Sequence, residues 1–143
     1  KSEITGKKDL NDSQQSAVKQ VLDDRRRFTL IQGPPGTGKT TTASAIISGW
    51  LKSNRGPVLA SAFSNRGCDN IAQQLHNLGV KVLRMGLCSA KEPYSLETRL
   101  AEAGYNKRGD KGLKAVMENV DVVCATCIGC GMGPMDSRTF PLI

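Results

Sequence analysis

The chain has 143 residues, a formal net charge of +7 and an aromatic content of only 4%. This length suits one domain with a hydrophobic core, and the positive charge favours a polyanionic partner such as nucleic acid. Few aromatic residues argue against OB-fold or RRM stacking platforms. The sequence has no 18-residue apolar run and no signal-peptide pattern, which predicts a soluble, intracellular protein without a membrane partner.

The first predicted elements are a helix and a strand. Residues 1–9 are polar and are expected to form a flexible segment. Asp12 or Ser13 is suited to cap a helix that runs to about Leu22. After a charged turn, the apolar residues of 28–32 predict a buried strand.

A glycine-rich loop follows this predicted strand. Residues 33–40, GPPGTGKT, match the phosphate-binding pattern G-x-x-x-x-G-K-[ST] without a mismatch. The glycines allow backbone amides to approach a phosphate closely, and a helix expected from about Gly38 to Lys52 adds its positive dipole end. Lys39 supplies a charge for the outer phosphates, and the Thr40 hydroxyl suits Mg²⁺. We therefore predict a bound nucleoside triphosphate with Mg²⁺, Lys39 and Thr40 as the catalytic residues, and a binding loop of Gly33, Pro34, Pro35, Gly36, Thr37, Gly38, Lys39, Thr40 and Thr41.

Strands and helices alternate in the rest of the chain. Strands are predicted at 58–63, 80–85 and 121–126, with another beginning in 139–143. Helices are predicted after the cap-type residues Ser64 and Asn65, around 96–103 inside a polar insertion (87–112), and around 113–118. This alternation predicts an α/β fold, a parallel sheet with helices on both faces. The P-loop, Ser64, Asn65 and Thr126 would then lie at the carboxyl ends of strands, where ligands bind in such sheets.

Four segments occur in the order typical of superfamily 1 helicases: LNDSQQSAV (10–18), IQGPPGTGKTTT (31–42), PVLASAFSNRGCDNI (57–71) and DVVCATCIGCG (121–131). The set closely resembles the up-frameshift RNA helicase family, whose members act in nonsense-mediated mRNA decay. The resemblance implies that residues 10–143 belong to a first RecA-like domain, a P-loop NTPase fold. It also implies an ATP-dependent helicase of the cytoplasm or nucleus that moves on single-stranded RNA or DNA.

The resemblance assigns roles to individual residues. Gln14 matches the glutamine that reads the adenine edge of ATP, and its amide suits that edge. Ser64, Asn65 and Thr126 match residues that contact the nucleic-acid strand. Phe63 departs from the family pattern, because relatives have proline there, and "RGCD" (66–69) replaces a more apolar stretch.

Hydrolysis would need parts that the family has beyond this sequence. The Walker B carboxylates would follow directly after Ile143, and the arginine would come from a second RecA-like domain of the same chain. We therefore expect that these residues alone hydrolyse ATP negligibly.

Two other functions stay open from the sequence. One is another P-loop ATPase of the AAA+ type, although no Asp-Glu pair follows Thr40. The other is a module that binds nucleic acid without moving along it. Cys124, Cys127 and Cys130 have a spacing seen in iron–sulfur proteins, but the fourth cysteine and proline of that pattern are missing.

Overall fold

The structure is a computed structural model that describes residues 10–23, 27–131, 135 and 138–143. The predicted flexible segment 1–9 lies outside these residues. The chain divides into two compact units, Lys1–Arg55 and Gly56–Ile143, and each is described by itself.

The first unit contains two helices, α1 (Asp12–Leu22) and α2 (Lys39–Lys52), at the predicted positions. The predicted cap of α1 was wrong by one residue, because Asn11 is the N-cap. The Asn11 side chain accepts a hydrogen bond from the Gln14 amide (2.9 Å), while the Gln14 side chain accepts one from the Asn11 amide (3.0 Å). This reciprocal capping box satisfies two backbone amides at once.

The two helices pack closely near the end of α1. A Cβ atom added to Gly49 of α2 would lie only 2.7 Å from a Leu22 methyl group, so a larger residue there would require Leu22 to move. The Arg55 guanidinium also donates to the Leu22 carbonyl (3.0 Å) and lies 5.1 Å from the centre of the Trp50 ring. These contacts fix the C-terminal end of α1 against α2.

The predicted strand at 28–32 was wrong, since this segment is a loop. The side chains of Phe28 and Leu30 are 86% and 91% exposed, respectively. A strand exists only where its backbone groups are paired with a neighbouring strand, and an apolar run alone does not guarantee that pairing.

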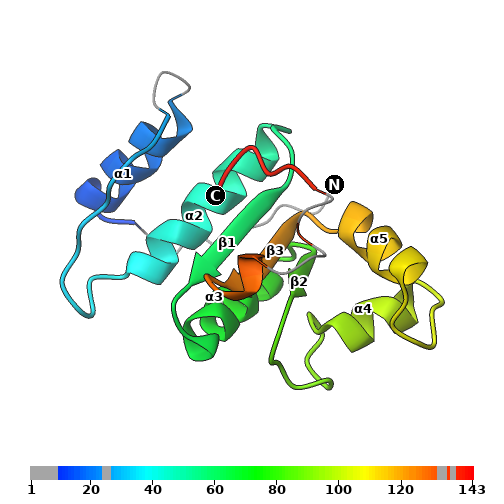
Figure 1. The fold of residues 1–143 in the computed structure, drawn as a ribbon. Coiled ribbons are helices and arrows are strands. Elements are labelled where there is room, and N and C mark those ends of the chain that lie inside the picture. Colours follow the sequence, from blue (N-terminus) through cyan, green and yellow to red (C-terminus); the bar gives the residue numbers. More distant parts are fainter. Residues whose placement is uncertain (1–9, 24–26, 132–134, 136–137) are drawn as a thin grey trace. The chain divides into compact units, whose positions relative to one another are not determined.

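The second unit is built on a parallel sheet of β1 (Val58–Ala62), β2 (Val82–Arg84) and β3 (Val122–Thr126). The order is β1-β3-β2, so β3 is central (Figure 1). All three strands lie within the predicted ranges, with shorter ends. In the predicted strand start at 139–143, Leu142 forms one parallel bridge with Val58, and its carbonyl accepts from the Leu59 amide (2.9 Å).

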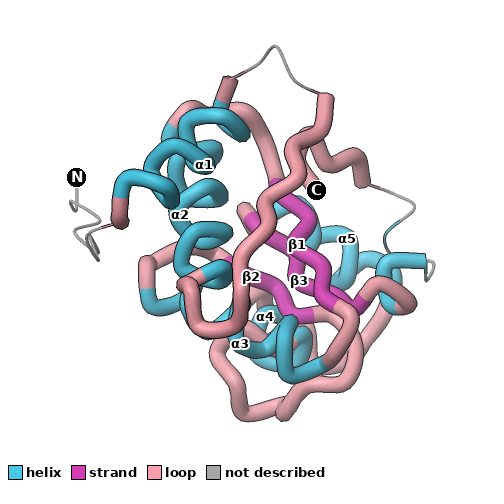
Figure 2. Tube along the Cα trace, turned by 90° about the vertical axis from the view of Figure 1, so that its left-hand side faces the viewer, coloured by secondary structure: helices cyan, strands magenta, loops and turns pink. Residues whose placement is uncertain are grey.

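Helices cover both faces of this sheet (Figure 2). α3 (Asn65–Asn77) packs on all three strands and buries Cys68, Ala72 and Leu75. On the other face, α4 (Leu96–Glu102), α5 (Asp110–Asn119) and alternate strand residues form a second core. A short 3-10 helix, η1 (Gly129–Gly131), follows β3. This second core includes Leu59, Leu83, Leu96, Leu100, Val116, Met117, Val120, Val123, Ala125 and Met135.

The segment 87–112 contributes to this core rather than only to the surface. Tyr94, Ser95, Leu96 and Leu100 are buried. The Tyr94 carbonyl accepts a hydrogen bond from the Arg84 amide (2.8 Å), which ties the segment to the end of β2. Helix α5 begins three residues earlier than predicted, at Asp110. Gly112, near its start, packs against Leu100 and Tyr105 at distances that leave no room for a Cβ atom.

Candidate functional site

The glycine-rich loop adopts the conformation that its composition predicts. Gly36 and Gly38 have φ values of 79° and 77°, which strongly favour glycine. The Thr37 amide and hydroxyl both donate to the Pro34 carbonyl, at 3.4 Å and 2.7 Å. A Cβ atom on Gly33 would lie 2.7 Å from the Thr37 hydroxyl oxygen, so a side chain there would displace that hydroxyl from its bond to Pro34. The loop is therefore a tight turn that delivers the chain directly into α2.

The backbone amides of this turn remain available to a ligand. Within the described part of the chain, the amides of Gly36, Gly38, Lys39 and Thr40 do not donate to other protein groups. The amide of Thr42 is the first to bond within the helix, to the Gly38 carbonyl (2.9 Å). Free amides at a helix start combine local donors with the positive dipole end, which is the usual setting for phosphate binding.

The Lys39 ammonium lies at the mouth of the same turn. It donates to the carbonyls of Gly33 (2.8 Å) and Pro34 (2.9 Å), so it spans the loop from its first residues to the start of α2. Lys39 itself is exposed, while Thr40 and Thr41 in the next positions are half-buried. Lys39 is thus within reach of an anion bound by the loop amides.

Gln14 connects α1 to this loop. Its side-chain nitrogen donates to the Thr37 carbonyl (2.9 Å) and lies 2.8 Å from the place that a Cβ atom on Gly38 would take. The side-chain oxygen of Gln14 accepts a hydrogen bond from the Asn11 amide in the capping box. The Gln14 side-chain amide is therefore oriented by both the start of α1 and the P-loop. The structure therefore brings Gln14 next to the loop.

A second group of predicted residues lies at the carboxyl edge of the sheet, where β1, β2 and β3 end. Ser64 is the N-cap of α3, and its hydroxyl accepts from the Gly67 amide (3.1 Å). Thr126 pairs in register with Ala62, and its hydroxyl accepts from the Gly129 amide (3.1 Å). Ser64 and Thr126 thus end neighbouring strands on one edge.

The Gly67 backbone explains part of the unusual "RGCD" stretch. A Cβ atom at Gly67 would lie 3.0 Å from the Ala62 methyl group and 3.2 Å from the Ser64 hydroxyl. Glycine therefore allows the first turn of α3 to approach the end of β1, which outweighs its low helix propensity.

Sequence reasoning missed Arg84, the last residue of β2. Its side chain is fully buried and bonds Asp69 (2.8 Å) and the Asn65 side chain (2.9 Å), both in α3. It also donates to the carbonyls of Met85 and Leu87 after β2. A buried cation is stable only when paired and saturated with acceptors, so Arg84 ties the first turns of α3 to the loop after β2. The available indication was one arginine in an otherwise apolar strand.

This network also changes the expected role of Asn65. Because its side-chain oxygen accepts from Arg84, that oxygen is used within the protein. The backbone amides of Asn65 and Arg66 make no hydrogen bond among the described residues. At this position, the backbone rather than the Asn65 side-chain oxygen is available to an anion.

The three cysteines of the iron–sulfur-like spacing do not converge. Cys124 is buried in β3, and burial raises the pKa of its thiol to about 12. Cys127 and Cys130 instead flank the Ser61 hydroxyl, at 3.4 Å and 3.6 Å from its oxygen. Among the described residues, no three His, Cys, Asp or Glu side chains are arranged to hold a metal ion.

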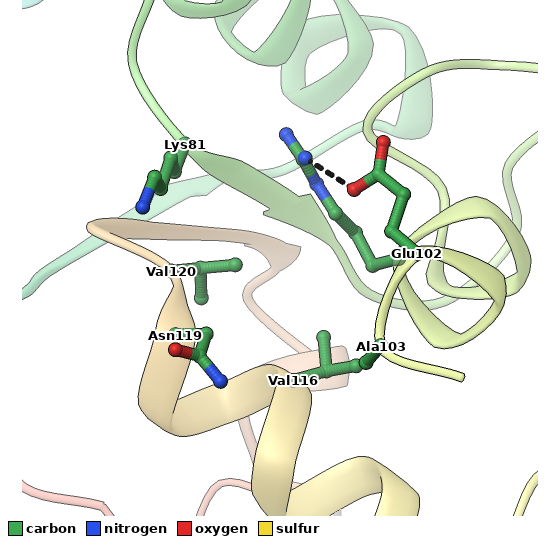
Figure 3. A pocket seen from close by; sticks show the side chains of 7 residues that line it. Lys81, Glu102, Ala103, Val116, Asn119 and Val120 are labelled. Atoms are coloured by element: carbon green, nitrogen blue, oxygen red, sulfur yellow. Dashed lines mark hydrogen bonds and ion pairs between the residues drawn. The ribbon is translucent and has the colours of Figure 1, made fainter. Parts of the chain in front are cut away.

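A hollow in the second unit lies at the opposite, amino-terminal edge of the sheet. It has a volume of about 280 Å³, and its lining includes Arg99, which pairs with Glu102 (2.8 Å). Figure 3 shows Lys81, Glu102 and the C-terminal end of α5 around it. None of the predicted site residues lines it. The cavity is therefore separate from the carboxyl edge of the sheet.

Comparison with known proteins places this geometry in a family. A protein-family model described as an AAA domain matches residues 9–106, more than half of the chain. The chain belongs to this AAA domain family. The match includes the P-loop and the carboxyl end of β1, and it supports the RecA-like P-loop fold class.

The chain is similar to curated proteins whose names describe helicases or regulators of nonsense transcripts. The "ATP-dependent helicase NAM7" of Saccharomyces cerevisiae is 34% identical over 90% of the chain, and the "Putative regulator of nonsense transcripts 1" of Takifugu rubripes is 46% identical over 88%. A Neurospora crassa "Regulator of nonsense transcripts 1 homolog" is 32% identical over 92%. The resemblance to the up-frameshift family is thus confirmed. The chain spans only 14% to 16% of these relatives' own length.

No described helix has both the length and the apolar character needed to cross a membrane.

Proposed function

We propose that this chain is the ATP-binding part of an ATP-dependent helicase that moves on single-stranded RNA or DNA. On this proposal, residues 10–143 belong to the first of two RecA-like domains, and the second completes the ATPase site. The names of the relatives support this activity and a role in nonsense-mediated mRNA decay. The compartment that we propose is the cytoplasm or nucleus.

The observation that carries the proposal is the free-amide turn with Lys39 at its mouth. The unbonded amides of Gly36, Gly38, Lys39 and Thr40 fit the phosphates of a nucleotide. Lys39, which now donates to the Gly33 carbonyl, would hold the outer phosphates of ATP, and Gln14 would offer its amide to adenine. Mg²⁺, which Thr40 would help to hold, neutralises charge on the outer phosphates.

The carboxyl edge of the second unit is the proposed contact for the nucleic-acid strand. The amides of Asn65 and Arg66 face a phosphate at the start of α3, and Thr126 lies at the end of the neighbouring strand. These contacts are to the backbone, so they allow binding without a fixed base sequence.

The test is the ATPase rate of the full-length protein with and without poly(U) or single-stranded DNA. We expect strong stimulation by at least one polymer, and loss of activity in Lys39→Ala. Lys52→Ala, at the exposed end of the same helix, is the matched control and should keep the rate. ATP hydrolysis that neither polymer stimulates would favour another P-loop ATPase. Salt-dependent strand binding without hydrolysis would favour a binding module.

A further inference from the structure

Each of the three strands ends next to an exposed apolar side chain. Phe63 follows β1 and is 93% exposed, Ile128 follows β3 at 77%, and Leu87 follows β2 at 79%. Because the strands are parallel in the order β1-β3-β2, the three side chains share the carboxyl edge in the order Phe63, Ile128, Leu87. Apolar groups gathered at one edge, rather than scattered singly, indicate a binding surface.

The charge around Phe63 selects the kind of partner. Phe63 directly precedes the N-cap of α3, and Arg66 is exposed in the first turn of that helix. The nearby carboxylate of Asp69 is paired with Arg84, which offsets its charge. An apolar surface beside a positively charged helix start suits a molecule with phosphates and flat bases. It suits a protein surface with few acidic residues less well.

Phe63 differs from its two apolar neighbours in chemistry. Only an aromatic ring presents a flat π-face on which any of the bases can stack, and stacking on it does not depend on base sequence. Ile128 and Leu87 lack a π-face, so they can offer a base only van der Waals contact. Phe63 is also the residue directly before Ser64, the N-cap of α3. A base stacked on the Phe63 ring and a phosphate at the start of α3 can therefore belong to one nucleotide.

We propose that Phe63 is a base-stacking residue and supplies the part of the strand affinity that depends on bases. The phosphate of the same nucleotide lies at the amides of Asn65 and Arg66. This inference rests on the proposed function, because it assumes that a nucleic-acid strand occupies the carboxyl edge of the sheet.

The experiment compares two probes by competition fluorescence anisotropy on the full-length protein. One probe is a short oligouridylate, and the other is an oligomer of equal length and charge whose sugars lack bases. The variants are Phe63→Leu, which keeps bulk but removes the ring, and Phe63→Tyr, which keeps the ring. Tyr105→Leu is the matched control, because Tyr105 is an exposed aromatic residue in the loop after α4.

We expect Phe63→Leu to weaken oligouridylate binding about tenfold, the loss of one stacked base. Its affinity for the base-free oligomer and the salt dependence of binding should stay unchanged. Phe63→Tyr and Tyr105→Leu should bind both probes like the parent protein. This pattern separates stacking from a structural role, since a misplaced α3 would weaken both probes together.

Three results would overturn the inference while leaving the proposed function intact. They are equal binding of both probes by the parent protein, unchanged oligouridylate affinity in Phe63→Leu, and equal losses for both probes in that variant. If Phe63→Leu changed ATP hydrolysis in the absence of nucleic acid but left strand affinity unchanged, Phe63 would instead contact a protein domain. That result would also refute stacking. Failure of the parent protein to bind either probe would refute the proposed function itself.

Discussion

The ion pair of Arg84 and Asp69 should respond unequally when its two partners are removed. The Arg84 side chain is 0% exposed, whereas the Asp69 side chain is 41% exposed. Changing Asp69→Asn leaves a guanidinium in the interior without its counter-charge. Changing Arg84→Met removes the buried charge and leaves a carboxylate that water can reach. The aspartate substitution should therefore destabilise the protein more.

The magnitudes follow from these exposures. Removing one partner of a buried pair costs about 3–5 kcal/mol, and Asp69→Asn should lie near 3 kcal/mol because the new amide oxygen can still accept from Arg84. Arg84→Met loses the hydrogen bonds to Asn65 and to the Leu87 carbonyl, and methionine fills part of the volume. Its cost should be about 1–2 kcal/mol. The double variant, Arg84→Met with Asp69→Asn, should be about as stable as Arg84→Met alone. Without the arginine, the Asp69 carboxylate has no buried cation to neutralise.

The assay is urea denaturation followed by far-UV circular dichroism, with free energies of unfolding from linear extrapolation. Lys114→Met is the control, because Lys114 pairs with Glu118 at 4.0 Å with side chains 76% and 65% exposed. It should change stability by less than about 0.5 kcal/mol. If Arg84→Met cost more than Asp69→Asn, or if both behaved like the control, the account of Arg84 as a paired buried cation would be wrong.

Two further predictions concern the loop and the thiols. Gly33→Ala puts a methyl group 2.7 Å from the Thr37 hydroxyl, so affinity for a non-hydrolysable ATP analogue should fall on the order of tenfold in calorimetric titration. Gly131→Ala, where a Cβ meets open space, should bind normally, and equal affinity of the two variants would contradict the argument. In the native protein, a thiol reagent followed by peptide mass spectrometry should label exposed Cys127 well before buried Cys124, whose pKa is raised to about 12. Equal labelling rates would show that β3 is open to solvent.

Local sequence rules predicted the elements whose structure depends on neighbouring residues. The P-loop pattern located the turn and the start of α2, because glycines 36 and 38 and the helix start are encoded within eight residues. The cap at Ser64 and the apolar strand 122–126 were likewise found from their own composition. The adenine-reading role of Gln14 came only from resemblance, and its contact with Thr37 joins positions 23 residues apart.

Features that depend on distant partners were missed or wrong. The apolar residues at 28–32 resembled a strand, but strand formation depends on a pairing that no local pattern contains. Arg84 looked like an ordinary charged residue at a strand end, since its acceptors come from α3 and from the loop after β2. The exposure of Phe63 also required the structure, because an aromatic residue at the end of a strand is as easily buried as exposed.

If the proposed function holds, the close contact of Gly49 with Leu22 links nucleotide selectivity to a position away from the loop. A methyl group of Leu22 occupies the space that a side chain at position 49 would need, so the two helices lie close together there. The opposite end of α1 carries Gln14, whose amide is proposed to distinguish adenine from other bases. Discrimination between ATP and GTP would then be set partly by the spacing of two helices, at a glycine that never touches the nucleotide.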